Sequence, residues 1–219
     1  METEKKSKPK KATNLLNAYR EYLLTEGKRP ATVFKFCKEV GITETEFYQQ
    51  FASFEGLEKH IWTTYLTETK QKMEADSDYQ KFTAREKILT FYFMLAEALK
   101  ADRSFVLFQL GAIKTPAITP AFLKGFKNGF EEWINSVLAV GKESGEIAKR
   151  PYVENQYANL FWFHLMFILQ FWAHDESTGF EKTDVAIEKS VTLAFDLIGK
   201  GVLDNALDFG KFLYQHSKN

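Results

Sequence analysis

Residues 30–62, PATVFKFCKEVGITETEFYQQFASFEGLEKHIW, hold the most informative pattern of the 219-residue chain. The pattern predicts two short helices joined by a tight turn at Gly41, with a third helix after them. Thr32 is placed to cap the first helix, while Thr43 and Glu46 form a capping box for the second. Two helices joined by a short glycine turn make a helix-turn-helix unit, whose second helix can enter the major groove of DNA.

The apolar, glycine and aromatic residues of this stretch follow a recognisable spacing: Thr32-Val33, Phe36-Cys37, Gly41-Ile42-Thr43, Phe47-Tyr48, Phe51, Ser53, Glu55 and Leu57. With this spacing, the stretch resembles the DNA-binding domain of the TetR family of bacterial transcriptional regulators. The resemblance implies an all-α, TetR-like fold with a three-helix helix-turn-helix domain over residues 12–62. Residues 63–219 would then form a helical ligand-binding and dimerisation domain.

The resemblance also implies which residues meet double-stranded DNA. Thr45, Tyr48 and Gln49 would face the groove, and threonines and lysines would lie near phosphates. The full predicted set is Thr32, Lys35, Thr43, Glu44, Thr45, Tyr48, Gln49 and Lys59. Residues 1–11, with five lysines and two glutamates, are expected to be a disordered basic tail. Such a tail either keeps the chain in solution or follows DNA phosphates.

The charge of this region complicates that expectation. Between residues 31 and 62, three lysines stand against five glutamates, although phosphate contacts need positive charge. Glu44 and Glu46 depart from the family pattern, which usually has lysine or a small polar residue there. Two interpretations stay open. Either the carboxylates stabilise the first turn of a helix, or DNA binding has been weakened or lost.

Composition limits the kinds of function and site that the chain can have. The formal net charge is zero, so no overall field attracts nucleic acid or acidic lipid. The 21 phenylalanines predict a bulky core or an aromatic-lined cavity. Cys37, the one cysteine, excludes an intramolecular disulfide or a cysteine-cluster metal site, and it is expected to be packed and inert. The polar N-terminus has no signal-peptide pattern, which predicts a cytoplasmic protein.

Enzymatic motifs are missing from the sequence. It contains no glycine-rich phosphate loop, no nucleophile elbow and no zinc-protease motif. We therefore expect no enzymatic activity, no cofactor and no metal site. The neighbouring residues His174, Asp175 and Glu176 point in different directions at a helix end, so they are not taken as metal ligands.

Apolar periodicity predicts helices through the rest of the chain, with no strand pattern. Thr83 and Glu86 form a second capping box, Asp102 is placed to cap the next helix, and Thr119-Pro120 can begin a long one. The helices expected after the first domain span about residues 54–75, 83–100, 102–113, 119–143, 151–172, 180–199 and 202–214, the last of them amphipathic.

Large apolar side chains on several of these helices predict a cavity for an apolar small-molecule effector. The predicted lining is Phe91, Met94, Phe108, Phe126, Phe130, Trp133 and His164. The alternative is that these side chains fill a plain core. Residues 160–172, LFWFHLMFILQFW, are too short to span a bilayer, so no stable membrane insertion is expected. Their apolar character predicts a homodimer through helices 151–172 and 180–199.

Residues 175–183, DESTGFEKT, are similar to the D-x-S-x-x-F-x-x-T segment of lipid-binding ubiquinone-biosynthesis proteins that share the TetR fold. This similarity implies an alternative function, a lipid- or isoprenoid-binding accessory protein with a vestigial DNA-binding region. The simpler interpretation is that Asp175 or Ser177 caps a helix.

Overall fold

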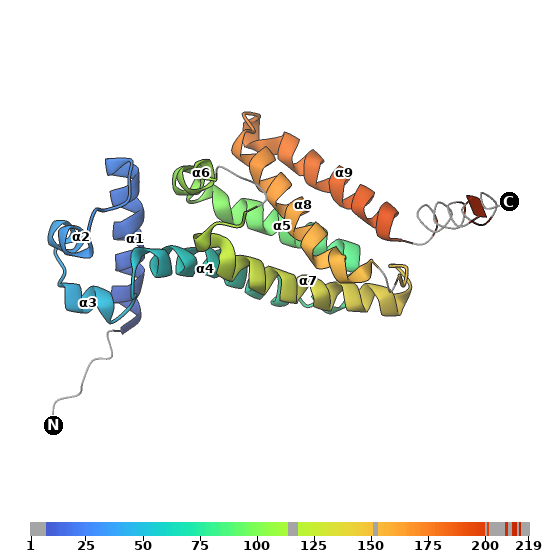
Figure 1. Cartoon of the computed structure of the whole chain (residues 1–219), viewed down its shortest axis with the longest axis horizontal. Coiled ribbons are helices and arrows are strands. Elements are labelled where there is room, and N and C mark those ends of the chain that lie inside the picture. Colours follow the sequence, from blue (N-terminus) through green and yellow to red (C-terminus); the bar gives the residue numbers. More distant parts are fainter. Residues whose placement is uncertain are drawn as a thin grey trace, which may run out of the picture. The chain divides into compact units, whose positions relative to one another are not determined.

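The computed structural model describes residues 8–113, 118–150, 153–199, 201, 209, 212, 213 and 215, with only the backbone described for residues 8–14. The described segments are helical (Figure 1), so the all-α fold class predicted from the sequence is confirmed. The helices are α1 (Lys8–Glu26), α2 (Val33–Val40), α3 (Glu44–Tyr48), α4 (Phe54–Glu74), α5 (Ala84–Lys100), α6 (Arg103–Gly111), α7 (Lys124–Ser144), α8 (Tyr157–Ala173) and α9 (Glu181–Ile198). Short 3-10 helices η1 (Tyr79–Lys81), η2 (Ala121–Leu123), η3 (Glu154–Gln156) and η4 (Thr178–Phe180) lie between them.

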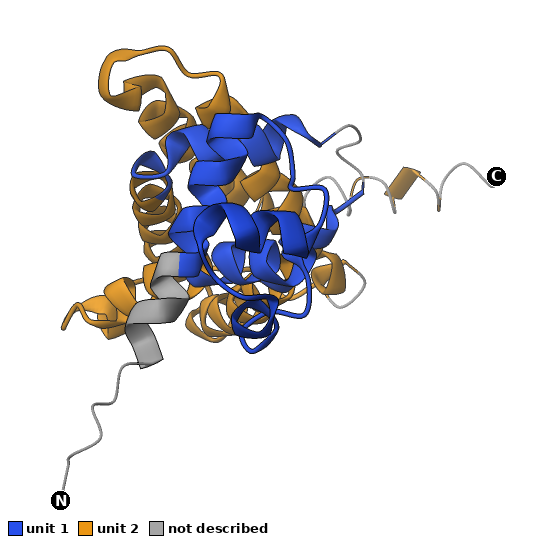
Figure 2. Ribbon diagram, turned by 90° about the vertical axis from the view of Figure 1, so that its left-hand side faces the viewer, with its two compact units in different colours: residues 1–65, 99–126 blue, residues 66–98, 127–219 orange. Residues whose placement is uncertain are grey.

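The chain forms two compact units, coloured separately in Figure 2. The first unit contains residues 1–65 and 99–126, and the second contains residues 66–98 and 127–219. The first unit is therefore discontinuous in sequence, because α6 groups with the helix-turn-helix region. The domain limits 12–62 and 63–219 stay a prediction from the sequence.

The first helix extends into residues 1–11, which the sequence predicts to be a disordered tail. α1 begins at Lys8, inside the segment expected to be a tail. Lysine and alanine favour helix, and a proline such as Pro9 is tolerated in the first turn because its missing N–H has no helical partner there. Residues 1–7 lie outside the described residues, as does most of the expected helix 202–214.

The helix-turn-helix region, residues 12–62, which we call the head, has the caps predicted from the sequence. Thr32 Oγ1 accepts a hydrogen bond from the Lys35 backbone N–H (3.1 Å) at the start of α2. Gly41 ends α2 with a φ of 73°, a left-handed conformation that glycine adopts without strain. At the start of α3, Thr43 and Glu46 form the reciprocal capping box.

Aromatic rings fill the core of the head. Phe36 packs against Tyr19, Phe47 and Phe54, with ring centroids 5.5 to 6.2 Å apart in edge-to-face arrangements. Cys37 lies beside them with 2% of its surface exposed. Burial, followed by the charges of nearby glutamates, raises the pKa of its thiol. The expected packed thiol is therefore present.

Two polar junctions join α1, α4 and α6 within the first unit. In the first, the Glu58 carboxylate on α4 is 1% exposed. It accepts hydrogen bonds from Tyr19 Oη on α1 (2.6 Å) and from Gln109 Nε2 on α6 (3.4 Å). It also accepts from Arg29 Nε (3.2 Å) and pairs with the same guanidinium through Nη2. Burial and the bond to Glu58 raise the pKa of Tyr19 far above its ordinary value.

The second junction lies seven residues further along α4. Asp102 Oδ2 accepts a hydrogen bond from Tyr65 Oη (2.6 Å) and forms an ion pair with Arg20 Nη1 on α1 (3.3 Å). The Arg20 guanidinium also lies over the rings of Tyr65 and Phe105. Asp102 occupies the cap position of α6, but its side chain makes no capping hydrogen bond. The capping role predicted for it is wrong, because its carboxylate is committed to α1 and α4.

The second unit has its own aromatic core. Phe91 on α5 packs against Phe130 and Trp133 on α7, with centroids 5.5 and 4.5 Å apart. The capping box of Thr83 and Glu86 is present at the start of α5. A distant carboxylate completes this cap, since Glu146 accepts from the backbone N–H groups of Ala84 (2.8 Å) and Arg85 (3.0 Å).

Two helix starts differ from the sequence prediction. A 3-10 turn, η2, follows Pro120, so α7 begins at Lys124 rather than directly after Thr119-Pro120. α8 begins at Tyr157 rather than at Pro151, because hydrogen bonds from the backbone N–H groups of Val153 and Glu154 to Arg150 O make a turn there. None of the described helices is long and apolar enough to cross a bilayer.

Candidate nucleic-acid interface

The two sides of α3 carry different groups of side chains. Phe47 is buried in the head, and Glu46 and Gln50 lie toward α1. Thr45, Tyr48 and Gln49 are exposed, and Tyr48 keeps 53% of its surface in solvent. The structure therefore places the three side chains predicted to face the groove together on the solvent side of α3.

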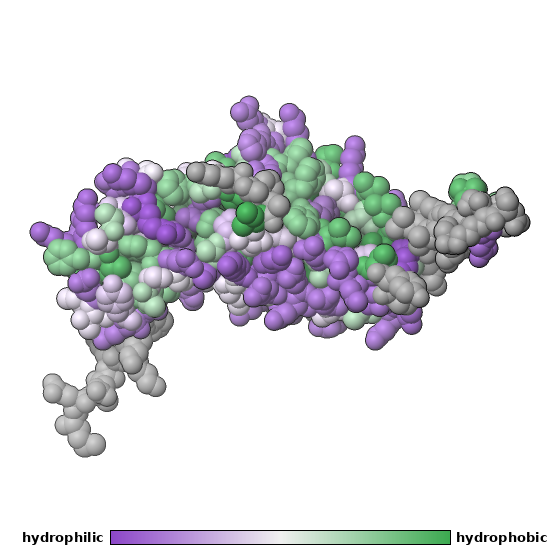
Figure 3. Space-filling view, viewed as in Figure 1, coloured by the Kyte–Doolittle hydropathy of each residue, from purple (hydrophilic) through white to green (hydrophobic). Residues whose placement is uncertain are grey.

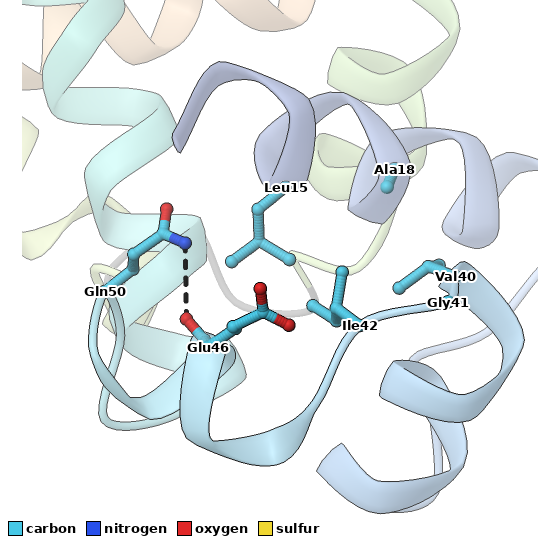
Figure 4. Close-up of a pocket in the computed structure, with 7 residues that line it drawn as sticks. All are labelled: Leu15, Ala18, Val40, Gly41, Ile42, Glu46 and Gln50. Atoms are coloured by element: carbon cyan, nitrogen blue, oxygen red, sulfur yellow. Dashed lines mark hydrogen bonds between the residues drawn. The ribbon is translucent and has the colours of Figure 1, made fainter. Parts of the chain in front are cut away.

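A hollow of about 270 Å³ lies on the other side of α3, and Figure 4 draws the residues that line it. The hollow is lined by Leu15 and Ala18 from α1, Val40 from α2, Gly41 and Ile42 from the turn, Glu46 from α3, and Gln50 just after α3. Gln50 Nε2 donates a hydrogen bond to the Glu46 backbone carbonyl (3.2 Å) at the end of the short helix. These contacts fix the rotation of α3 about its own axis and so fix which residues face outward.

The two lysines predicted to contact phosphates are already paired within the head. Lys35 Nζ lies 3.8 Å from Glu39 Oε1, and Lys59 Nζ lies 2.7 Å from Glu55 Oε1. Both pairs join residues four apart on exposed helix faces, where such pairs are weak. DNA phosphates would have to compete with these carboxylates for the lysines.

The glutamates of the head have distinct roles. Glu58 is buried in its junction and so adds no charge to the surface. Glu46 Oε2 accepts hydrogen bonds from the Thr43 backbone N–H (3.0 Å) and hydroxyl (3.1 Å). The structural interpretation of Glu46 is therefore confirmed. Glu44 is exposed at the first position of α3, and within the described residues it makes no hydrogen bond or ion pair.

Two of the three threonines of the predicted set are helix caps. Thr32 and Thr43 are exposed, and each hydroxyl accepts a backbone N–H of the helix that it precedes. A hydroxyl that caps a helix still presents its surface to solvent. Their placement near phosphates stays a prediction.

The predicted ligand residues are divided between the two units. Phe108 and Phe126 belong to the first, where Phe126 packs against Trp62 with centroids 6.1 Å apart. In the second, the contacts of Phe91, Phe130 and Trp133 make them part of a packed core, and Met94 on the same helix as Phe91 is half-buried. Their role as ligand contacts stays a prediction.

His164 on α8 is the polar member of the predicted set. Its Nε2 lies 2.8 Å from Ser190 Oγ, and its Nδ1 lies 3.3 Å from Tyr92 Oη. Burial lowers the pKa of His164 to about 4, so the ring is neutral near pH 7. One edge of His164 also lines a shallow apolar hollow of about 280 Å³ between α8 and α9.

An exposed apolar face covers α8 and α9, where green side chains gather in Figure 3. Its members keep between 36% and 59% of their surface in solvent: Leu160, Phe163, Phe167, Phe171, Val185, Leu193 and Leu197. We call these seven residues the apolar face. The sequence showed that residues 160–172 are mostly apolar, but it did not show which side faces outward. In the sequence, the four-residue spacing of Leu193 and Leu197 on a polar helix was the signal that could have indicated an outward apolar side.

The residues that resemble a lipid-binding segment form a helix-capping corner. Asp175 Oδ1 accepts the backbone N–H and hydroxyl of Ser177 (2.8 and 2.6 Å). Its Oδ2 accepts the backbone N–H and hydroxyl of Thr183 (2.8 and 2.7 Å). Phe180 packs on Trp172 and adopts a left-handed φ of 67°. The capping interpretation of Asp175 is therefore confirmed.

Comparison with known proteins identifies the family. The sequence pattern described as "Tetracyclin repressor-like, C-terminal domain" matches residues 87–213, more than half of the chain. The chain belongs to the TetR family. No curated protein sequence matches this TetR-family chain.

Solved structures agree with this assignment. A candidate TetR-family transcriptional regulator from Syntrophomonas wolfei is similar, with a TM-score of 0.69 and 13% identity over 88% of this chain and 97% of that one. A candidate regulator of the same family from Shewanella sp. PV-4 gives 0.61 and 15%, over 84% and 97%. A bacterial regulatory protein in the TetR family from Rhodococcus RHA1 gives 0.52 and 12%, over 88% and 99%. At these identities the likeness shows the fold, so the TetR-like fold is confirmed.

Proposed function

We propose that this protein is a DNA-binding transcriptional regulator that acts in the cytoplasm as a homodimer and responds to an apolar small molecule. The observation that carries the proposal is the solvent side of α3, which leaves Thr45, Tyr48 and Gln49 exposed. Glutamine pairs with adenine in the major groove, and threonine can contact either a base edge or a thymine methyl. A helix-turn-helix with capped, rigid helices presents these groups in one fixed arrangement.

DNA binding can be tested with duplexes selected from a random library by the full-length protein. Fluorescence anisotropy should show binding of the selected duplex by wild type, and Gln49→Ala should weaken it roughly 5- to 150-fold, as expected for one lost base contact. Gln71→Ala is the matched control, because Gln71 is an exposed glutamine on α4 outside the head. If wild type selects no duplex, the regulator function is wrong.

The homodimer is supported by the apolar face on α8 and α9. A helical surface with this many half-exposed aromatic and aliphatic side chains marks an interaction site. A second copy packed through the same face would bury it on both protomers. The effector is supported by the apolar hollow between α8 and α9 that His164 helps to line.

A second function has one observation in its favour. Both lysines expected at phosphates are neutralised by glutamates, which fits a lipid-binding accessory protein with a vestigial head. Organic extraction of the purified protein, followed by mass spectrometry, would identify a retained lipid. A retained lipid together with failed duplex selection would favour the accessory protein over the regulator.

A further inference from the structure

One carboxylate of the head, that of Glu44, lies at an exposed position in the first turn of α3. Lys35, Lys59, Glu46 and Glu58 each have a charged or hydrogen-bonded partner. Glu44 differs from them, because it is exposed and, over the described residues, forms neither a hydrogen bond nor an ion pair. Thr43 already caps α3 through its own hydroxyl. The helix does not need the Glu44 carboxylate for its cap.

Helix geometry places Glu44 beside the groove-facing residues. At 3.6 residues per turn, Glu44, Thr45, Tyr48 and Gln49 fall within an arc of roughly 140°. Glu46, Phe47 and Gln50 occupy the remaining arc toward the core and α1, in agreement with their burial and contacts. The N-terminal residues of a recognition helix are the ones that reach base edges. Glu44 therefore belongs to the outward set.

A carboxylate can make only a few favourable contacts in this position. It accepts hydrogen bonds and donates none when ionised. Phosphates, guanine O6 and N7, and thymine O4 are all acceptors, so each repels it. Adenine offers an amino donor but places the N7 acceptor beside it. The major-groove edge of cytosine offers the N4 amino donor, which is the group that glutamate recognises.

We propose that Glu44 is a specificity-determining residue of the head and selects an operator half-site with a cytosine opposite it. The inference rests on the proposed DNA-binding function and adds to it the base class that the head requires. Glu44 attracts the correct site and also penalises others, because a duplex with no donor there leaves an unpaired carboxylate against electronegative groups. Lys35 and Lys59 are paired with glutamates, which limits their attraction to the phosphates of any DNA sequence. The choice of sequence then depends more on Glu44.

The test is parallel selection from a random duplex library with four full-length proteins. They are wild type, Glu44→Gln, Glu44→Ala and the control Glu21→Gln, which removes an exposed carboxylate from α1 in the same unit. Wild type and Glu21→Gln should select the same half-site, with a cytosine at one position. Glu44→Gln should replace this cytosine by adenine, since glutamine pairs with adenine. Glu44→Ala should lose the preference there and keep the others.

Anisotropy on the selected site gives the second readout. Replacing the cytosine should weaken wild-type binding roughly 5- to 150-fold and weaken Glu44→Ala by less than twofold. If both Glu44 variants select the wild-type cytosine unchanged, the inference is wrong while the DNA-binding function stands. If wild type and Glu21→Gln select no sequence, the DNA-binding function fails and the inference falls with it.

Discussion

Replacing Glu58 by alanine should destabilise the first unit more than any other single carboxylate change in the head. The substitution removes the acceptor of the Tyr19 hydroxyl, which is fully buried, and of the Gln109 amide, which is 4% exposed. Each buried donor left without a partner costs about 1–3 kcal/mol. Arg29 loses its ion pair at smaller cost, because its side chain is 51% exposed and water replaces the carboxylate. With the lost packing of one methylene, the expected cost is about 3–6 kcal/mol.

Thermal unfolding followed by far-ultraviolet circular dichroism measures this loss. For a chain of this size, 1 kcal/mol corresponds to about 2–4 °C, so Glu58→Ala should lower Tm by roughly 6–24 °C. Hydrogen exchange should rise in peptides from α1, α4 and α6 together, because the junction joins these helices. Glu58→Gln should have a smaller effect, since its amide oxygen can still accept from Tyr19. The control Glu55→Ala removes an exposed carboxylate from the same helix and should leave Tm unchanged. Equal melting of Glu58→Ala and Glu55→Ala would refute the role of the junction.

Three further predictions concern the second unit. Asp175→Ala should destabilise it by about 2–3 kcal/mol in urea unfolding, because four hydrogen bonds to the carboxylate are lost. Burial alone would raise the pKa of Asp175, but the bonds from Ser177 and Thr183 hold it well below its ordinary value. Wild-type stability should therefore fall as the pH drops below about 4, and the variant should lose this dependence. Phe167→Glu should give a monomer in light scattering at micromolar concentration, because it places a charge on the apolar face. The control Val140→Glu on α7 should leave the mass unchanged. An unchanged mass for Phe167→Glu would contradict dimerisation through the apolar face. The pKa of His164 is about 4 in the folded chain and ordinarily near 6.5. The contribution of the neutral ring to the free energy of unfolding should therefore be complete above about pH 6.5 and decrease toward pH 4. A variant His164→Phe should show a flatter Tm over that interval, and an unchanged slope would contradict the burial of a neutral ring.

Local features of the fold could be predicted from the sequence because their causes lie within a few residues. Thr32, Gly41 and the pair Thr43 and Glu46 act on backbone groups at most three or four positions away. Capping chemistry depends on side-chain type and spacing, both of which a sequence displays directly. For the same reason, the solvent side of α3 follows from helical periodicity once the helix start is known.

Features set by distant partners could not be predicted in this way. Glu58 is separated from Gln109 by 51 positions, and nothing in the spacing of a charged residue on α4 indicates burial. Asp102 has the right type and position for a cap, but Tyr65 and Arg20 compete for it. Glu146 caps α5 from 62 positions away. In each case a polar group binds a partner that tertiary packing brings close, and local propensity does not indicate that partner.

The discontinuity of the first unit affects the order in which the chain can fold as it is synthesised. Translation proceeds at roughly 5–20 residues per second, so the 51 positions between Glu58 and Gln109 correspond to several seconds. Through that interval the helix-turn-helix of the first unit lacks α6, and the Glu58 carboxylate has only Tyr19 and Arg29 as partners. A chain that stops before residue 102 would also lack Asp102, which accepts a hydrogen bond from Tyr65 Oη and pairs with Arg20. The native first unit is therefore complete only after the ribosome has entered the segment that the family pattern assigns to the C-terminal domain.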